Sequence, residues 1–144
     1  MFSKACQYGI KASVYIASQS ELGNRVSLRE IAYNVNSPEA FTAKILHQLA
    51  KQNILTSLKG PTGGFEIPKG RAAQIKLCNI VSAIDGDSIY VGCALGFDRC
   101  DARQPCPMHN KFVDIRDNLR EMLENTSLLE LANGLDVGMS FLKR

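Results

Sequence analysis

Tryptophan is absent from this sequence, and aromatic residues make up only 7% of its 144 residues. A core must therefore consist mainly of aliphatic side chains. No apolar run approaches the roughly 20 residues needed to span a bilayer. Gln7 and Lys11 also interrupt the N-terminal apolar stretch that a signal peptide requires. These absences predict a globular protein of the cytoplasm that does not enter a membrane.

Signatures of common catalytic sites are also missing. The sequence has no Walker-type lysine loop, no dinucleotide-binding glycine fingerprint and no evident nucleophile–base pair. Its five cysteines, an odd number, fit poorly with a disulfide framework. In a reducing compartment they indicate metal ligands or reactive thiols instead. We therefore expect a protein that is not an enzyme.

Charge is unevenly distributed, although the formal net charge is only +3. Residues 1–80 carry ten Lys and Arg against four Asp and Glu, whereas residues 81–144 carry seven against ten. A basic first half and an acidic second half are typical of a nucleic-acid-binding domain joined to an assembly module. Solvated surface charge without a partner gives the same distribution. We divide the chain into a DNA-binding domain, 1–80, and a cysteine loop with a dimerisation helix, 81–144.

Hydrophobic periodicity predicts helices over residues 3–19, 27–34 and 38–52. The second begins with a capping box from Ser27 to Glu30, and a three-residue turn separates it from the third. Such a closely spaced pair is typical of a helix-turn-helix, although any small helical bundle can contain one.

Two short β-prone runs, residues 55–58 and 65–67, flank a turn-rich segment and predict a β-hairpin. Three helices followed by a hairpin give the order of a winged helix. The expected fold class is therefore mainly α with a small β-hairpin wing (α+β), a winged helix-turn-helix plus a long dimerisation helix. A further helix is predicted over residues 75–85, and a loop over residues 92–108.

From about residue 110 a longer helix carries apolar residues three, four and three positions apart. This heptad-like seam suits packing against a symmetry mate, and packing on the same chain would explain it equally. The predicted dimer contacts are Phe112, Ile115, Leu119 and Met122. A capping box at Ser127 precedes a short last helix ending near residue 134.

In a winged helix, the second helix of the pair enters the major groove. Phe41, Ile45 and Leu49 are expected to point inward, so the remaining side chains should face DNA. Lysine and glutamine suit phosphate and base acceptors, and methyl groups suit thymine. A lysine beside glycines at the wing tip can approach a phosphate or the minor groove, although an ordinary hairpin can carry the same residues. The predicted DNA-binding residues are Ser27, Glu39, Ala40, Thr42, Ala43, Lys44, His47, Gln48, Lys51, Lys59, Thr62 and Gly63.

Cys93, Cys100, Cys106 and His109 lie within seventeen residues of each other, with six, five and two residues between them. Thiolates and imidazole are good ligands for transition metals. Zinc sites usually pair cysteines more closely, whereas wider gaps are compatible with an iron–sulfur cluster, whose ligands spread over two irons. Redox-active thiols are the alternative to metal, and incidental cysteines a third reading. The other two cysteines fall in predicted helices and are expected in the core.

These features together resemble the Rrf2 family of bacterial winged-helix transcription regulators. The resemblance rests on the helix pair, on Leu-Lys-Gly-Pro-Thr-Gly-Gly-Phe (58–65), on the three-cysteine loop and on Thr-Ser-Leu-Leu-Glu-Leu-Ala (126–132). It covers essentially the whole chain. It implies a homodimer that binds double-stranded DNA and packs through a long helix. In members with the cysteines, an iron–sulfur cluster modulates operator binding.

The resemblance also implies roles for single residues. The three loop cysteines match the family's cluster thiolates, and His109 matches a histidine ligand of members that regulate iron–sulfur assembly. Lys59 stands where those members carry an arginine aimed at the minor groove. The implied cofactor is an iron–sulfur cluster, with [2Fe–2S] favoured. A thiol redox switch or a zinc site is the alternative, and a protein–protein adaptor without DNA is a third hypothesis.

Three departures from the family pattern limit this transfer. Six residues rather than five separate the first two loop cysteines, so the loop must bulge. Gln7 stands where nitric-oxide-sensing members have an aspartate ligand, and an amide is a poor iron ligand. We therefore expect ligation by three cysteines and one histidine, and no nitric-oxide role. Ala43 replaces a glutamate that selects operators in the assembly regulators, so the operator cannot be transferred.

Overall fold

Seven helices and one two-stranded antiparallel sheet form the fold in a computed structural model that describes residues 1–144. The elements, in chain order, are α1 (Lys4–Glu21), α2 (Leu28–Val35), α3 (Glu39–Lys51), β1 (Thr56–Leu58), β2 (Gly64–Glu66), α4 (Leu77–Asp85), α5 (Ser88–Val91), α6 (His109–Asn125) and α7 (Leu128–Asp136). The predicted order of three helices and a hairpin is confirmed, and so is the mainly α fold class.

Local capping defines the helix pair α2–α3. The Ser27 hydroxyl accepts a hydrogen bond from the Glu30 N–H at 3.2 Å, and the Glu30 carboxylate accepts one from the Ser27 N–H at 3.2 Å. Together they form the predicted capping box. Asn36 ends α2 with a left-handed φ of 53°. Pro38, which the sequence placed at the first position of the predicted helix 38–52, occupies the N-cap, and Glu39 is the first helical residue of α3.

The hairpin is joined to the residue that precedes the helix pair. Ser57 pairs with Phe65 in the β1–β2 register, and Phe65 also pairs with Val26 through hydrogen bonds of 2.7 and 3.0 Å. Gly64 has a φ of 138°, and a Cβ there would lie 2.6 Å from the Val26 carbonyl oxygen. Only glycine therefore fits this crossing, which fixes the wing against the start of α2.

The core is aliphatic, as the composition predicted. Among its fully buried members are Ile16, Ile31, Leu46 and Leu123, and no phenylalanine or tyrosine is buried. The N-terminal helix α1 is central: α2, α3, α4 and α7 all pack on it. None of the helices is long and apolar enough to cross a membrane.

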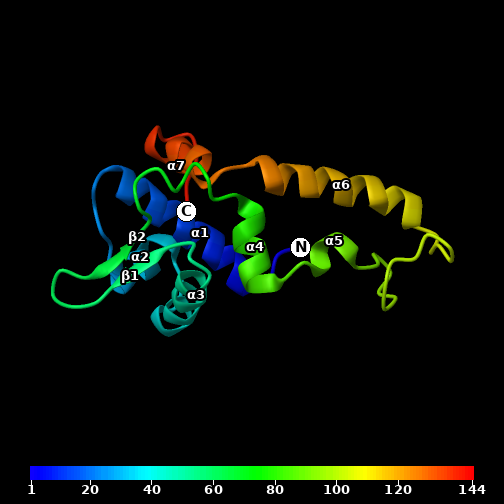
Figure 1. The fold of residues 1–144 in the computed structure, drawn as a ribbon, viewed down its shortest axis with the longest axis horizontal. Helices are drawn as coiled ribbons and strands as arrows, with labels where there is room; N and C mark the ends of the chain where they lie inside the picture. The colour runs from blue at the N-terminus through cyan, green and yellow to red at the C-terminus, as the bar shows by residue number, and fades with distance from the viewer.

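The second half of the chain is divided between the central body and an extension. Helix α7 returns to pack on α1, whereas α6 extends outward with α5 beside it (Figure 1). The sequence did not predict α5, because four residues are too few to show a helical period. The domain boundary expected at residue 80 falls within α4. The wing and the loop between α5 and α6 lie at opposite ends of the molecule (Figure 1).

Candidate functional site

The exposed face of α3 presents most of the residues expected to meet DNA. Their side chains lie on the side away from Ile45 and Leu49, which are buried, while Phe41 is half-buried against the Tyr8 ring. Ala43 is half-buried. The exposed residues are Glu39, Ala40, Lys44, His47, Gln48 and Lys51. Two lysines, an imidazole and an amide on one helix face can bind phosphates and base edges.

One residue of α3 differs from expectation, and a second makes a contact that the sequence did not predict. Thr42 was expected to face solvent, which is wrong, because its side chain is only 1% exposed. Its hydroxyl donates to the Pro38 carbonyl at 2.8 Å and shares a hydrogen bond with Ser37, so it closes the first turn of the helix. Gln48 is exposed, but its amide donates to the Ala83 carbonyl on α4 at 2.8 Å. Gln48 thus ties α3 to α4 in this conformation.

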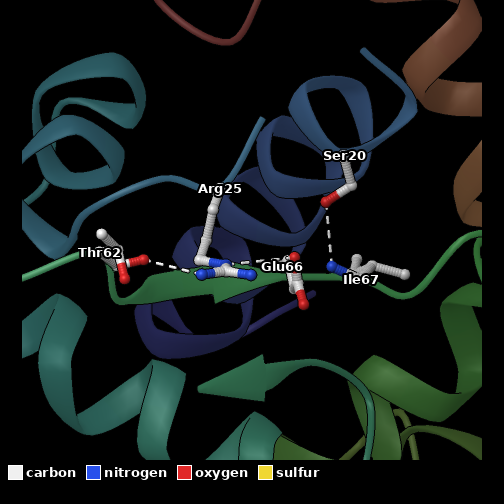
Figure 2. A network of polar contacts seen from close by, with 5 residues as sticks. All are labelled: Ser20, Arg25, Thr62, Glu66 and Ile67. Carbon is white, nitrogen blue, oxygen red and sulfur yellow. Dashed lines mark hydrogen bonds and ion pairs between the residues drawn. The ribbon is translucent and has the colours of Figure 1, made fainter. Parts of the chain in front are cut away.

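Arg25, which no sequence motif indicated, connects the wing to the body. Its guanidinium donates to the Thr62 carbonyl at 2.7 Å and forms an ion pair with Glu66 at 3.3 Å. Figure 2 shows these contacts beside the hydrogen bond from the Ile67 N–H to the Ser20 hydroxyl. At the tip, Lys59 and Thr62 are exposed and available to DNA. Arg25 and Glu66 are brought together by the β-bridge between their neighbours Val26 and Phe65, which no sequence pattern predicts.

The four predicted metal ligands line one pocket of about 480 Å³ in the loop between α5 and α6. Two of them are in contact: the Cys100 sulfur lies 3.2 Å from His109 Nδ1. Cys93 and Cys106 line the same pocket. No three Cys, His, Asp or Glu side chains surround a single point closely enough to hold one metal ion. In this conformation the four donors share a pocket without forming a closed site for one ion.

The environment of Cys93 favours its thiolate. Backbone N–H groups of Leu95 and then Phe97, together with the Cys106 side chain, hydrogen-bond its sulfur and lower the pKa of Cys93 below its ordinary value. Metal ligation requires deprotonated cysteine, so a lowered pKa makes Cys93 a better ligand in this loop conformation.

The remaining cysteines lie outside the loop, as expected. Cys6 is fully buried on α1, and Cys78 is half-buried on α4. Burial, together with the nearby Asp85 carboxylate, raises the pKa of Cys6 to about 12. Burial and the Glu124 carboxylate also raise the pKa of Cys78. Both thiols are therefore poor nucleophiles and poor ligands at neutral pH.

We expect Cys6 to resist alkylation by iodoacetamide at pH 8.5 in the folded protein, and to react fully in urea. Its folded-state pKa is raised from the ordinary value of 9.0, so its contribution to stability is complete below pH 9 and is lost as the pH rises through about 12. Peptide mass spectrometry of a time course measures the labelling. Equal rates for Cys6 in the folded and unfolded chain would show that the thiol is not held protonated.

An apolar surface lies exposed on α6 and the segment before it. Ile115 is 55% exposed and Met122 is 45% exposed, whereas Leu119 is half-buried against the core and Phe112 is half-buried. On the adjoining segment, the exposed apolar residues are Val91, Leu95, Phe97 and Met108. Large apolar side chains exposed on neighbouring segments, as here, often mark an interaction site.

Comparison with known proteins gives a consistent result. The model of the Rrf2 family, described as iron-dependent transcriptional regulators, matches residues 2–134. A putative HTH-type transcriptional regulator of Aquifex aeolicus is 29% identical over 135 residues, which covers 92% of each chain. The HTH-type transcriptional regulator IscR of Cronobacter sakazakii is 29% identical over 131 residues, covering 91% of this chain and 79% of the relative.

Solved structures share the fold at lower identity. CymR (YrzC), the global cysteine regulator of B. subtilis, superimposes with a TM-score of 0.76 at 22% identity, covering 92% of this chain and 96% of CymR. IscR of T. potens superimposes with a TM-score of 0.72 at 19% identity, covering 97% and 92%. The relatives are transcription regulators and not enzymes. This chain therefore belongs to the Rrf2 family and is a DNA-binding transcription regulator.

Proposed function

We propose that this regulator is a homodimer whose binding to operator DNA is modulated by an iron–sulfur cluster, [2Fe–2S] in type, held by Cys93, Cys100, Cys106 and His109. The observation that carries the proposal is the meeting of these four donors at one pocket, with Cys100 in contact with His109. A two-iron cluster needs two protein donors on each iron, and four donors complete that set. The bound cluster would supply a one-electron redox couple at the start of α6.

DNA would be bound by α3 and the wing. Lys44, His47 and Lys51 would meet the major groove from the exposed face of α3, and Lys59 would reach a phosphate or the minor groove. Ser27 and Thr62 lie exposed at the start of α2 and at the wing tip, where they can contact the DNA backbone. A regulator of this kind acts where the chromosome is, which we expect to be the cytoplasm.

The distance between the two sites determines how they can be coupled. The cysteine loop and the wing lie at opposite ends of one chain (Figure 1), so a cluster would lie far from the wing that the same chain places on DNA. Helix α6 begins at His109, a candidate ligand, and carries the exposed Ile115 and Met122. If α6 packs on its mate, a shift at its first turn changes the separation of the two α3 helices. Binding to half-sites about one DNA turn apart is sensitive to that separation.

A thiol switch is the second candidate, and one observation favours it. The Cys100 sulfur contacts both an imidazole and a guanidinium, because Arg116 Nη2 donates to it at 3.2 Å. Reactive cysteines are commonly found in partly exposed, electropositive surroundings of this kind. A two-electron oxidant such as a peroxide would convert the thiols of Cys93 and Cys106, which line the same pocket, to a disulfide and so close the loop without metal. One CymR of Staphylococcus aureus has been solved in an oxidised form.

Purification without oxygen tests the proposal. We expect a brown protein with about two irons and two sulfides per chain, as a [2Fe–2S] centre contains. An operator is selected from a random double-stranded DNA library, and fluorescence anisotropy then compares the loaded and the chelator-treated protein. Affinity should fall steeply with salt, by about 10³-fold or more between 50 and 200 mM, as phosphate contacts release counterions.

The outcomes separate the candidates. Protein without iron or sulfide, even after reconstitution, contradicts the cluster. Loss of two titratable thiols on mild oxidation, with a change in operator affinity, supports the thiol switch instead. One tightly bound zinc per chain supports a structural staple. A DNA affinity that does not change with salt concentration contradicts the assigned DNA-binding face.

A further inference from the structure

Arg116 of α6 holds the cysteine loop through two hydrogen bonds. Its Nη1 donates to the Gly92 carbonyl at 2.8 Å, and its Nη2 donates to the Cys100 sulfur at 3.2 Å. Gly92 immediately precedes the candidate ligand Cys93, so the two bonds hold both ends of the segment between the first two loop cysteines. One side chain therefore fixes the span of that segment.

The position of Arg116 on α6 adds a second contact to the same sulfur. His109 and Arg116 are seven residues apart, or two helical turns, and so lie on one face of α6. His109 Nδ1 lies 3.2 Å from the Cys100 sulfur, the same atom that Arg116 contacts. The Cys100 sulfur thus contacts two side chains, His109 and Arg116, on one face of α6.

The charge of Arg116 is not balanced by a carboxylate. The ion pairs in the structure are Arg25–Glu66 and Arg99–Asp101, and Arg116 forms none. Its Nε is buried and has no hydrogen-bond partner. A partly buried cation without a counter-charge is unfavourable. The Cys100 sulfur lies within hydrogen-bond distance of the guanidinium, and a sulfur that ligates a cluster is a thiolate, which would complete a charge-assisted pair.

We propose that Arg116 is a positioning residue that binds the Cys100 sulfur of the loaded loop and transmits the state of the loop to α6. This inference rests on the proposed function. Two ferric ions, two sulfides and three thiolates leave one net negative charge, which reduction doubles. A guanidinium at the sulfur stabilises the more negative state, and hydrogen bonds to ligand sulfur raise the reduction potential. Ile115, next to Arg116, lies on the exposed apolar surface, so movement of Arg116 reaches that surface directly.

Three variants test the role of Arg116. Arg116→Gln removes the charge, and Arg116→Lys keeps the charge but lacks the planar fork whose two nitrogens bind the two acceptors. Arg120→Gln is the matched control, because Arg120 lies one turn further along α6 and contacts the Tyr90 ring at 4.6 Å instead of the loop. The readouts are the reduction potential, from dithionite titration followed by visible absorption, and amide hydrogen exchange of residues 92–108 in cluster-free protein.

We expect Arg116→Gln to take up iron and sulfide but to have a lower reduction potential, and its cluster-free loop to exchange about tenfold faster. Arg116→Lys should retain most of the potential and lose the loop protection. Arg120→Gln should match the wild type in both. Circular dichroism melting shows whether each variant folds.

Each contrary result has a distinct meaning. An unchanged reduction potential in Arg116→Gln would show that Arg116 does not bind the Cys100 sulfur of the loaded loop. The proposal that the loop holds a cluster would not be affected. Unchanged exchange in cluster-free Arg116→Gln overturns the tether, whether or not iron binds. Wild-type protein that takes up no iron overturns the proposed function, and with it the recognition of a loaded loop.

Discussion

Replacing Cys100 with serine is expected to give a colourless protein that retains no more than traces of iron and sulfide after purification without oxygen. The Cys100 sulfur contacts a second donor, His109, and the α6 arginine, Arg116, both at 3.2 Å. A serine hydroxyl stays protonated near neutral pH and is a poor substitute for a thiolate on iron. Visible absorption and elemental analysis measure the loss.

The same substitution should remove the response of DNA binding to the cluster. Coupling between two sites typically amounts to about 1–3 kcal/mol, or about 5–150-fold in affinity. We expect loaded and cluster-free wild-type protein to differ by a factor in this range. The Cys100→Ser protein should bind operator equally before and after treatment with iron and sulfide. Fluorescence anisotropy on one operator measures all four affinities.

Cys78→Ser is the matched control for this result. Cys78 is half-buried on α4, outside the loop, and its raised pKa makes it a poor ligand. This variant should keep its colour, its iron and its DNA response. A Cys100→Ser protein with as much iron as the control would show that Cys100 is not a ligand, and the proposed set of donors would have to be replaced.

The sequence predicted best those features that depend on neighbouring residues. The capping box from Ser27 to Glu30 involves groups three positions apart, and it forms as expected. The wing was predicted from two β-prone runs around a glycine-rich turn, and the structure has two antiparallel strands at these runs. The four donors Cys93, Cys100, Cys106 and His109 were grouped from chain spacing alone, because a loop of this length can bring its own residues to one pocket.

Features that depend on contacts between distant segments were missed or mistaken. Thr42 was placed on the DNA face because the buried side of α3 was defined only by the apolar residues Phe41, Ile45 and Leu49. A polar side chain on the same side was therefore assigned to solvent. Its hydroxyl is satisfied within the helix start, so the side chain is buried without cost. Arginine is usually found on the surface, so the sequence offered no reason to assign partners to Arg25 and Arg116. Arg25 finds its partner through the packing of the wing, and Arg116 through the packing of the cysteine loop. A period or a motif cannot reveal such pairs.

Ile115→Glu is expected to dissociate the proposed homodimer and to lower operator affinity by about 10²–10⁴-fold. Ile115 and Met122 lie on one exposed stripe of α6, two turns apart. A two-fold axis brings each substitution into the interface twice, so two carboxylates would be buried in apolar surroundings without partners. A single chain binds one half-site and loses the gain in affinity that linked binding provides. Sedimentation equilibrium and anisotropy measure the two effects.

Asp117→Lys is the control, because two residues along α6 turn a side chain to nearly the opposite face. It changes the charge more than Ile115→Glu does, yet should remain dimeric and bind normally. An Ile115→Glu protein that stays dimeric would show that another surface joins the chains. A monomer whose DNA affinity still responded to the cluster would require a route within one chain, from the loop through α6 and α4 to α1 and α3. Because the loop and the wing lie at opposite ends of the chain (Figure 1), we expect dimerisation and the cluster response to be lost together.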